Sequence, residues 1–280
     1  MDRLQLVRTL EGFLAEDIGA GDITTATIFT DKELGEAHFI AKESFVAAGM
    51  LSVAAQVFTI QNPAIAVTET ATDTDRVAVG DILLIAKGPV ADLLQAERVA
   101  LNLVQRLSGI ATLTACFVAA VNPLPVKIVD TRKTTPGLRV LEKYAVRVGG
   151  GHNHRFNLAD GVLIKDNHIA ACGSITEAVA RARHQAPHTL KIEVEAENIE
   201  QVRECLACGV EVILLDNMSP AQLRDAVAIA KGKALLEASG GVNLSNVREI
   251  AESGIDLISI GALTHSAPAV DISMRLTTGI

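Results

Sequence analysis

Short apolar runs alternate with helical patterns along the second half of the chain. The runs are Val126–Val129, Val162–Ile164, Lys191–Val194, Val212–Leu215, Ala234–Leu236 and Leu257–Ile260. Helical patterns lie between several of them, and Ser174, Ser219 and Ser245 stand where helix N-caps are expected. A strand followed by a helix, repeated with short connections, predicts parallel strands joined by right-handed crossovers. Since no strand–GxGxxG–helix unit appears, we expect an α/β fold of the incomplete βα-barrel type, with fewer than eight strands.

The first part of the chain has a mixed pattern. Apolar positions at helical spacing predict helices over Leu4–Glu16, near Leu51–Ile60 and over Ala91–Val121. Strand-like segments are Ala37–Ala47, Ala64–Thr70 and Asp81–Ala86. We therefore predict an N-terminal α+β sandwich domain over residues 1–110, joined by the C-terminal tail 269–280. The barrel domain then covers residues 111–268.

Composition narrows the class of protein. The net charge is -8 and aromatic residues make up 3%, which argues against a basic nucleic-acid face and against stacking platforms. The uncharged stretches Ser44–Thr68 and Leu107–Val126 contain Asn and Pro residues, so we interpret them as buried elements joined by turns. Acidic residues interrupt the N-terminus where a signal peptide would be apolar, and four cysteines show no framework spacing. We expect a cytoplasmic protein.

Polar and glycine residues follow each predicted strand of the barrel. They are Asp130, Lys165, Asp166, Glu195, Asp216, Asn217, Ser239, Gly240, Gly241 and Gly261. The carboxyl ends of parallel barrel strands converge on one face, where active sites of this architecture lie. The alternative is that strands simply end in polar turn residues. That alternative does not explain why charged residues recur there, so we favour a functional site.

The segment Thr131–His168 reverses the sign of the chain's charge. Seven Lys and Arg residues stand against three acidic residues, which gives +4 inside a chain of -8. Such a reversal indicates an anion site. Arg139, Lys143 and Arg147 recur at intervals of four and have a simpler alternative reading as one solvated helix face.

Two further features of the strand ends predict ligands. Glu195 and Asp216 end successive strands, and such a carboxylate pair suits Mg²⁺; salt bridges to nearby cations are the alternative. Ser239-Gly240-Gly241 and Ile260-Gly261-Ala262 are similar to the paired late-strand loops whose backbone N–H groups hold a phosphate.

Four segments form a long and specific motif. They are Asp130-Thr-Arg-Lys-Thr-Thr-Pro-Gly137, Glu142-Lys-Tyr-Ala-Val-Arg147, Gly149-Gly-Gly-His-Asn-His-Arg155 and Leu163-Ile-Lys-Asp-Asn-His168. The motif closely resembles the nicotinate-nucleotide pyrophosphorylase (carboxylating) family, also called quinolinate phosphoribosyltransferase. Matching segments elsewhere extend the resemblance over the whole chain, among them Glu16–Thr25, Glu97–Leu103 and Glu237–Gly241. His152 departs from it, since Lys is expected there in many bacterial relatives.

The resemblance implies an Mg²⁺-dependent enzyme of NAD synthesis, active on quinolinate and 5-phosphoribosyl 1-pyrophosphate. It also implies a role for each matching residue. Lys133 would lie between quinolinate and the pyrophosphate, and Glu195 and Asp216 would hold Mg²⁺ and the ribose. The residues that would clamp the quinolinate carboxylates are Arg132, His154, Arg155, Lys165 and, from the partner subunit of a homodimer or dimer-based oligomer, Arg98. Those that would hold the 5-phosphate are Ser239, Gly240, Gly241, Gly261 and Ala262.

Other functions remain open from the sequence alone. A molybdenum-transport-associated family resembles this fold and motif, and nicotinate phosphoribosyltransferase shares the architecture. A non-catalytic sugar-phosphate-binding protein built on a barrel is a third alternative, but it would not need the Glu195 and Asp216 pair.

Overall fold

The computed structural model describes residues 2–30 and 33–278, and the chain divides into two compact units. The first unit takes its described residues from 1–113, 135–149 and 267–280. The second unit comprises residues 114–134 and 150–266. Residues 135–149 lie inside the segment that the sequence places in the barrel domain, yet they pack with the first unit.

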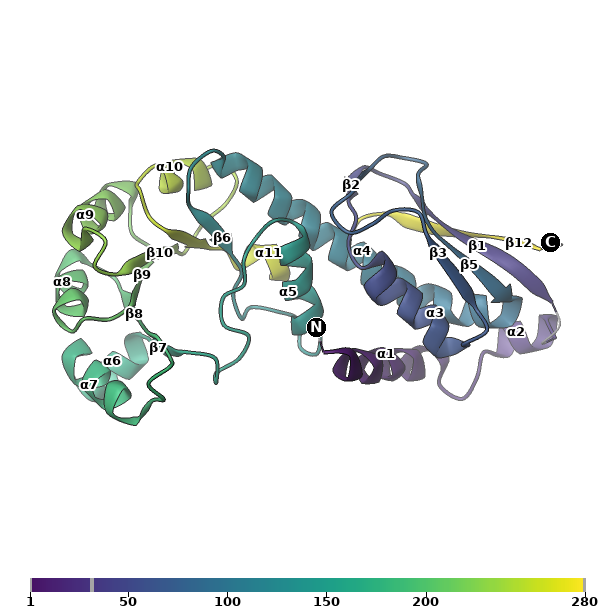
Figure 1. The fold of residues 1–280 in the computed structure, drawn as a ribbon, viewed down its shortest axis with the longest axis horizontal. Coiled ribbons are helices and arrows are strands. Elements are labelled where there is room, and N and C mark those ends of the chain that lie inside the picture. The colour runs from purple at the N-terminus through teal and green to yellow at the C-terminus, as the bar shows by residue number, and fades with distance from the viewer. Residues whose placement is uncertain (1, 31–32, 279–280) are drawn as a thin grey trace. The chain divides into compact units, whose positions relative to one another are not determined.

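The first unit is built on an antiparallel sheet with the strand order β12-β1-β5-β3 (Figure 1). Its strands are β1 (Leu34–Ala41), β3 (Ala66–Glu69), β5 (Ile82–Pro89) and β12 (Ile272–Thr278). Every second residue of β1 is buried, from Gly35 through Phe39 to Ala41. The Phe39 ring meets Phe58 edge-on, with 5.7 Å between the ring centroids. That contact packs a helix against the buried face of the sheet, as in an α+β sandwich.

The first unit contains seven further elements among the described residues. They are α1 (Arg3–Ile18), α2 (Ile23–Ile28), β2 (Phe45–Val46), the π-helical turn η1 (Met50–Ala54), α3 (Ala55–Gln61), β4 (Arg76–Val77) and α5 (Arg139–Val148). Helix α1 packs against α3, and β2 pairs with β4. The predicted strand over Ala37–Ala47 is therefore two strands, because the chain turns after Ala41.

Helix α5 does not present one solvated basic face. Lys143 and Glu142 are fully buried, whereas Arg147 is exposed. Arg106 Nε lies 2.7 Å from Glu142 Oε1, and the backbone N–H of Thr135 donates to the other carboxylate oxygen. Buried charges are retained when they are paired and hydrogen-bonded. The regular spacing of the three basic residues predicts a solvent-exposed Lys143, and that prediction is wrong.

Helix α4 (Val90–Val121) is 32 residues long and passes from the first unit into the second. By length and composition alone, it is the one helix of the described residues that could cross a membrane. Half of its most apolar window is buried within the protein, and core helices pass the same test.

The second unit is a parallel sheet in the order β6-β11-β10-β9-β8-β7, with helices along its convex side (Figure 1). The strands are β6 (Lys127–Val129), β7 (Val162–Ile164), β8 (Ile192–Ala196), β9 (Val212–Asp216), β10 (Leu235–Ser239) and β11 (Leu257–Ser259). The helices are α6 (Asp166–Cys172), α7 (Ile175–Gln185), α8 (Ile199–Ala207), α9 (Pro220–Ala230), α10 (Val247–Ala251) and α11 (Ala262–His265). Each predicted apolar run overlaps one of these strands, and the six-stranded sheet confirms the incomplete barrel.

Two of the three predicted serine caps are present. Ser174 and Ser219 accept hydrogen bonds from the third residue of the helix that each precedes. Ser245 does not cap α10, which begins after Asn246; its hydroxyl donates instead to the side chain of Asn243. The local asparagine turn competes for the serine hydroxyl, as short polar side chains in loops often do.

The sheet of the second unit is open between its edge strands β6 and β7. His152 forms a parallel bridge with Val129, next to the free edge of β6. Asp130, which is fully buried, accepts hydrogen bonds from the backbone N–H of His154 at 2.9 Å and from Asn153 Nδ2 at 2.5 Å. These bonds hold the glycine-rich segment against the edge strand and place the residues that follow it at the mouth of the barrel.

Gly109 of α4 and Gly12 of α1 offer a test of packing in the first unit. A Cβ at Gly109 would overlap the backbone oxygen of Pro268, whereas nothing lies within 4 Å of a Cβ at Gly12. We expect Gly109→Ala to lower the free energy of unfolding by about 1–3 kcal/mol through overpacking. Gly12→Ala should raise it by about 0.5–1 kcal/mol through helix propensity. Thermal unfolding of both variants measures the two signs; equal effects would contradict the close approach.

Candidate active site

One cavity of about 820 Å³ opens at the carboxyl ends of the barrel strands. Alternate residues of each strand face it, because side chains along a strand point to opposite sides. From β9 these are Leu214 and Asp216, and from β10 Glu237 and Ser239. Every site residue predicted from the sequence except Arg98 lines this cavity. Arg98 lies exposed on α4, within the first unit.

Basic side chains come to the cavity from three segments of the second unit. Arg132 and Lys133 follow β6, Arg155 follows the glycine-rich segment, and Lys165 follows β7. Burial lowers the pKa of the Arg155 guanidinium, and the positive charge of Arg132 adds to this effect. Two like charges held close together in a partly desolvated place favour a bound anion that neutralises both.

Lys165 makes an ion pair with Glu195 of β8, with 2.6 Å between Nζ and Oε2. The Lys165 backbone is also fixed, because its N–H donates to His168 Nδ1 at 2.9 Å across the first turn of α6. His168, the last residue of the motif, therefore acts as a cap. For Glu195, the alternative that the acidic pair forms salt bridges with nearby cations is therefore observed. Glu195 is nearly buried, and the ion pair orients its carboxylate toward the cavity.

Asp216 ends β9, and Asn217 follows it in the left-handed region, with φ of 54°. Asn217 Nδ2 donates to Asp216 Oδ2 at 2.7 Å. A Cβ at Gly240 would overlap the Asn217 side chain, and Gly240 itself has φ of 95°. Glycine is required at position 240 on both counts, because only glycine leaves room for Asn217 and adopts this φ without strain.

Gly261 allows a second close approach at the cavity. A Cβ there would lie 2.9 Å from Lys133 Cδ and 3.1 Å from His265 Nε2. The Lys133 backbone oxygen accepts a hydrogen bond from the Thr264 hydroxyl at 2.8 Å. Lys133, one of the cavity's basic residues, thus lies directly beside a loop predicted to hold phosphate.

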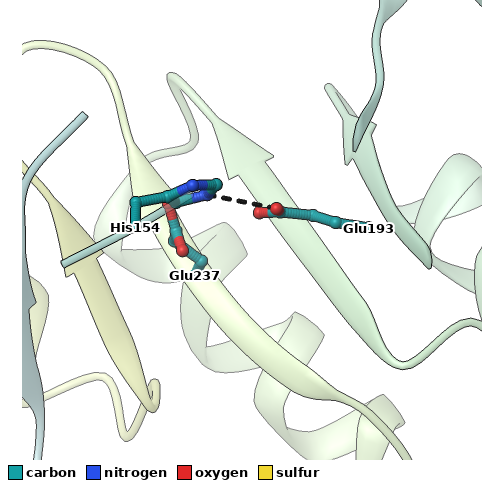
Figure 2. Close-up of side chains that lie close together, drawn as sticks. All are labelled: His154, Glu193 and Glu237. Carbon is teal, nitrogen blue, oxygen red and sulfur yellow. Dashed lines mark ion pairs between the residues drawn. The ribbon is translucent and has the colours of Figure 1, made fainter. Parts of the chain in front are cut away.

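A buried cluster lies beneath these groups, inside the barrel. It consists of His154, Glu193 of β8 and Glu237 of β10, which we call the His154 cluster (Figure 2). His154 Nε2 lies 3.1 Å from Glu193 Oε2 and 3.7 Å from Glu237 Oε1. Burial, followed by the charge of Glu193, raises the pKa of Glu237 to about 7. The three ligand atoms lie within 4.8 Å of one another, so the cluster has the composition of a metal site as well as that of a proton-sharing group.

Comparison with known proteins identifies the relatives of this chain. The protein-family model described as "Quinolinate phosphoribosyl transferase, C-terminal domain" matches residues 110–275. The family model of the corresponding N-terminal domain matches residues 22–108. The chain belongs to the quinolinate phosphoribosyl transferase family.

Individual relatives cover nearly the whole chain. The "Probable nicotinate-nucleotide pyrophosphorylase (carboxylating)" of Bacillus subtilis (strain 168) is 47% identical over 99% of this chain and 95% of its own length. The structure of NadC from Streptococcus pyogenes is 43% identical, covers 100% of this chain and 99% of its own, and has a TM-score of 0.96. The human nicotinic acid phosphoribosyltransferase structure is 14% identical, with a TM-score of 0.61, and is similar in fold alone.

The sequence patterns did not predict that two acidic residues inside β8 and β10 belong to the site. Glu193 and Glu237 stand two positions before Glu195 and Ser239 and therefore point to the same side of the sheet. A charged residue inside an apolar strand, two positions from a residue of the site, could have indicated this role. The sequence patterns also missed His265, which lines the cavity, and they identified Asn217 only as a polar residue at a strand end.

The raised pKa of Glu237 predicts how stability depends on pH. In the folded protein Glu237 keeps its proton up to about pH 7, whereas in the unfolded chain it releases the proton above about pH 4.5. The contribution of this group to stability therefore falls as the pH rises through that window and stays low above it. Asp130 and Ser259 face the same carboxyl group, and the charges of Asp130 and Glu193 both favour the protonated form.

We expect Glu237→Gln to remove this penalty, since an amide does not ionise. As the pH rises from below 4.5 to above 7, the free energy of unfolding of the variant should increase by up to about 3 kcal/mol relative to that of wild type. Chemical unfolding of both proteins at several pH values measures the difference. A stability gap that does not change with pH would show that Glu237 is ionised throughout.

Proposed function

We propose that the protein transfers the phosphoribosyl group of 5-phosphoribosyl 1-pyrophosphate to quinolinate, with loss of carbon dioxide. The products are nicotinate mononucleotide and pyrophosphate, as in de novo NAD synthesis. The observation that carries the proposal is the single cavity that joins a basic side, an acidic pair and two glycine loops. The names and coverage of the full-length relatives support the same reaction.

The basic side of the cavity suits a dicarboxylate. Arg132, Arg155 and Lys165 line it together, and arginine pairs with carboxylates through two parallel hydrogen bonds. Such pairing orients the pyridine ring as well as attracting it. Nicotinate has one carboxylate and would leave part of this charge uncompensated, which favours quinolinate as the acceptor.

We infer that the enzyme uses Mg²⁺. Glu195 and Asp216 would hold the ion with oxygens of the ribose and pyrophosphate, since Mg²⁺ prefers a few carboxylates and otherwise water or substrate oxygens. When bound, the ion would neutralise charge on the leaving pyrophosphate. The two residues suit this role because both line the cavity, from neighbouring strands, and Lys165 and Asn217 orient their carboxylates.

The reaction needs positioning more than covalent help. The C1–pyrophosphate bond breaks as positive charge develops on the ribose, and the pyridine nitrogen bonds to C1. The C2 carboxylate then leaves as carbon dioxide, and the electron pair that remains on C2 takes up a proton from solvent. The arginines hold the ring so that its nitrogen faces C1. Lys133, packed beside Gly261, donates to the leaving pyrophosphate, where negative charge accumulates. Ser239, Gly240, Gly241, Gly261 and Ala262 hold the 5-phosphate through the loop backbone.

We further propose a homodimer in the cytoplasm. Arg98 lies exposed on α4 and would reach the quinolinate site of the partner subunit. Each subunit would then complete the other's site, and a monomer would bind quinolinate poorly.

One assay tests the reaction. Purified protein is mixed with quinolinate, 5-phosphoribosyl 1-pyrophosphate and Mg²⁺, and nicotinate mononucleotide and carbon dioxide are followed. We expect equal amounts of both products and their loss with excess chelator, restored by Mg²⁺. Consumption of nicotinate instead of quinolinate would decide for the nicotinate enzyme, and ligand binding without product for a binding protein.

Lys133→Ala tests the leaving-group role. Because Lys133 acts mainly on charge that develops in the transition state, we expect kcat to fall by about 10²–10³-fold with a smaller change in KM. Lys233→Ala, an exposed lysine before β10, is the matched control and should behave as wild type. Near-normal turnover of Lys133→Ala would remove Lys133 from the mechanism.

Subunit complementation tests Arg98. Arg98→Ala and Lys133→Ala should each be nearly inactive alone. If the sites are shared, a mixed dimer has one complete site, so random equimolar mixing should restore roughly a quarter of wild-type activity. Mixtures that stay inactive after demonstrated subunit exchange would place Arg98 outside the partner's site.

A further inference from the structure

The His154 cluster lies between two cavities of the second unit. His154 and Glu237 line both the main cavity and a smaller one of about 470 Å³. The smaller cavity is bounded by residues at the starts of strands, such as Lys191 and Val212. Glu193 and Glu237 are 8% and 2% exposed, so both carboxyl groups lie in the barrel interior. An arrangement so costly to bury needs a compensating interaction, and the imidazole lies where it provides one (Figure 2).

The hydrogen bonds of His154 define which ring nitrogen carries the proton. Its Nδ1 accepts the backbone N–H of Arg155 at 2.7 Å. A ring nitrogen that accepts a hydrogen bond carries no proton, so the proton is on Nε2. Nε2 is the atom that faces Glu193 at 3.1 Å and Glu237 at 3.7 Å. Glu193, the nearer carboxylate, therefore selects the tautomer that carries its proton on Nε2.

The same bonds argue against a metal ion in the cluster. A metal bound at Nε2 would need the lone pair there and would move the proton to Nδ1. Nδ1–H would then point at the Arg155 N–H, which is also a donor. A proton, unlike a cation, leaves this backbone hydrogen bond intact. The pKa of Glu237, raised to about 7, agrees with a proton held among these groups near neutral pH.

We propose that Glu193 is a positioning residue for the acceptor site: by fixing the tautomer of His154, it makes the imidazole hold the backbone of Arg155. This inference rests on the proposed function. Arg155 is held at a second point, because Nη1 donates to the Gly161 oxygen at 2.9 Å. With backbone and guanidinium both fixed, Arg155 meets a carboxylate in one orientation. His154 thus contributes to the acceptor site by placing Arg155, rather than as a charged clamp.

Variants of Glu193 separate the hydrogen bond from the charge. Glu193→Gln keeps a carbonyl oxygen that accepts the Nε2 proton, whereas Glu193→Leu has similar bulk and no acceptor. We expect Glu193→Leu to raise KM for quinolinate about tenfold, the effect of losing one hydrogen bond, while KM for phosphoribosyl pyrophosphate and kcat stay within about twofold. Glu193→Gln should remain within about threefold of wild type for quinolinate. Glu200→Gln, exposed on α8, is the control.

A double-mutant cycle tests whether Glu193 acts through His154. In a His154→Ala background, Glu193→Leu should add no further rise in KM for quinolinate. Independent, multiplicative effects would show that Glu193 acts by another route and would overturn the proposal. Loss of affinity for both substrates together would indicate general disruption of the barrel, with the same consequence.

The tautomer can be read without any turnover. Nitrogen NMR of the imidazoles, with His154 assigned by its absence in His154→Ala, should give a protonated Nε2 and an unprotonated Nδ1 in wild type and in Glu193→Gln. Glu193→Leu should lose this preference. A protonated Nδ1 in wild type would overturn the proposal even if quinolinate is not the substrate, whereas an inactive enzyme with the expected tautomer would count against the proposed function alone. One equivalent of tightly held transition metal, lost in Glu193→Leu, would establish a metal site instead.

Discussion

The carboxylate of Asp130 holds the glycine-rich segment against the edge strand β6, where the sheet of the barrel is open. It is fully buried at the end of β6, and it accepts hydrogen bonds from Asn153 and from the backbone of His154. Beside these bonds, the backbone of His152 pairs with that of Ile128 and Asp130, so the glycine-rich segment satisfies backbone groups along the edge of β6. The position of Arg155 on the basic side of the cavity depends on this anchor, since His154 directly precedes it.

Charge inside the second unit is arranged in layers. At the cavity, Lys165 pairs with Glu195; one step deeper, His154 lies between Glu193 and Glu237. Buried ionisable groups cost free energy that the rest of the fold must supply. Such a cost is typical of sites where geometry matters more than stability. The second unit therefore gives up stability in its core to hold its site residues in one arrangement.

Much of this architecture could be predicted from the sequence, because strand burial and strand direction leave clear patterns along the chain. Apolar runs located all six barrel strands, and the convergence of parallel strand ends placed Glu195, Asp216 and Ser239 in one cavity. Residue patterns did not predict that Lys143 is buried, since its partners come from tertiary packing. They also missed Glu193 and Glu237, because a charge within an apolar run does not reveal what it faces. Ser245 failed as a cap because a neighbouring asparagine competes for its hydroxyl.

The alternation along β8 has a consequence for how this sequence can evolve. Ile192, Val194 and Ala196 alternate with Glu193 and Glu195, so neighbouring positions serve packing and chemistry in turn. Inserting or deleting one residue within the strand would exchange the two sets, turning carboxylates toward the helices and aliphatic groups into the cavity. Substitutions can therefore be accepted one at a time, but changes of length in β8 should be rejected by folding and by catalysis together. Loops that carry no residue of the cavity are free of this double constraint and are where variation in length should gather.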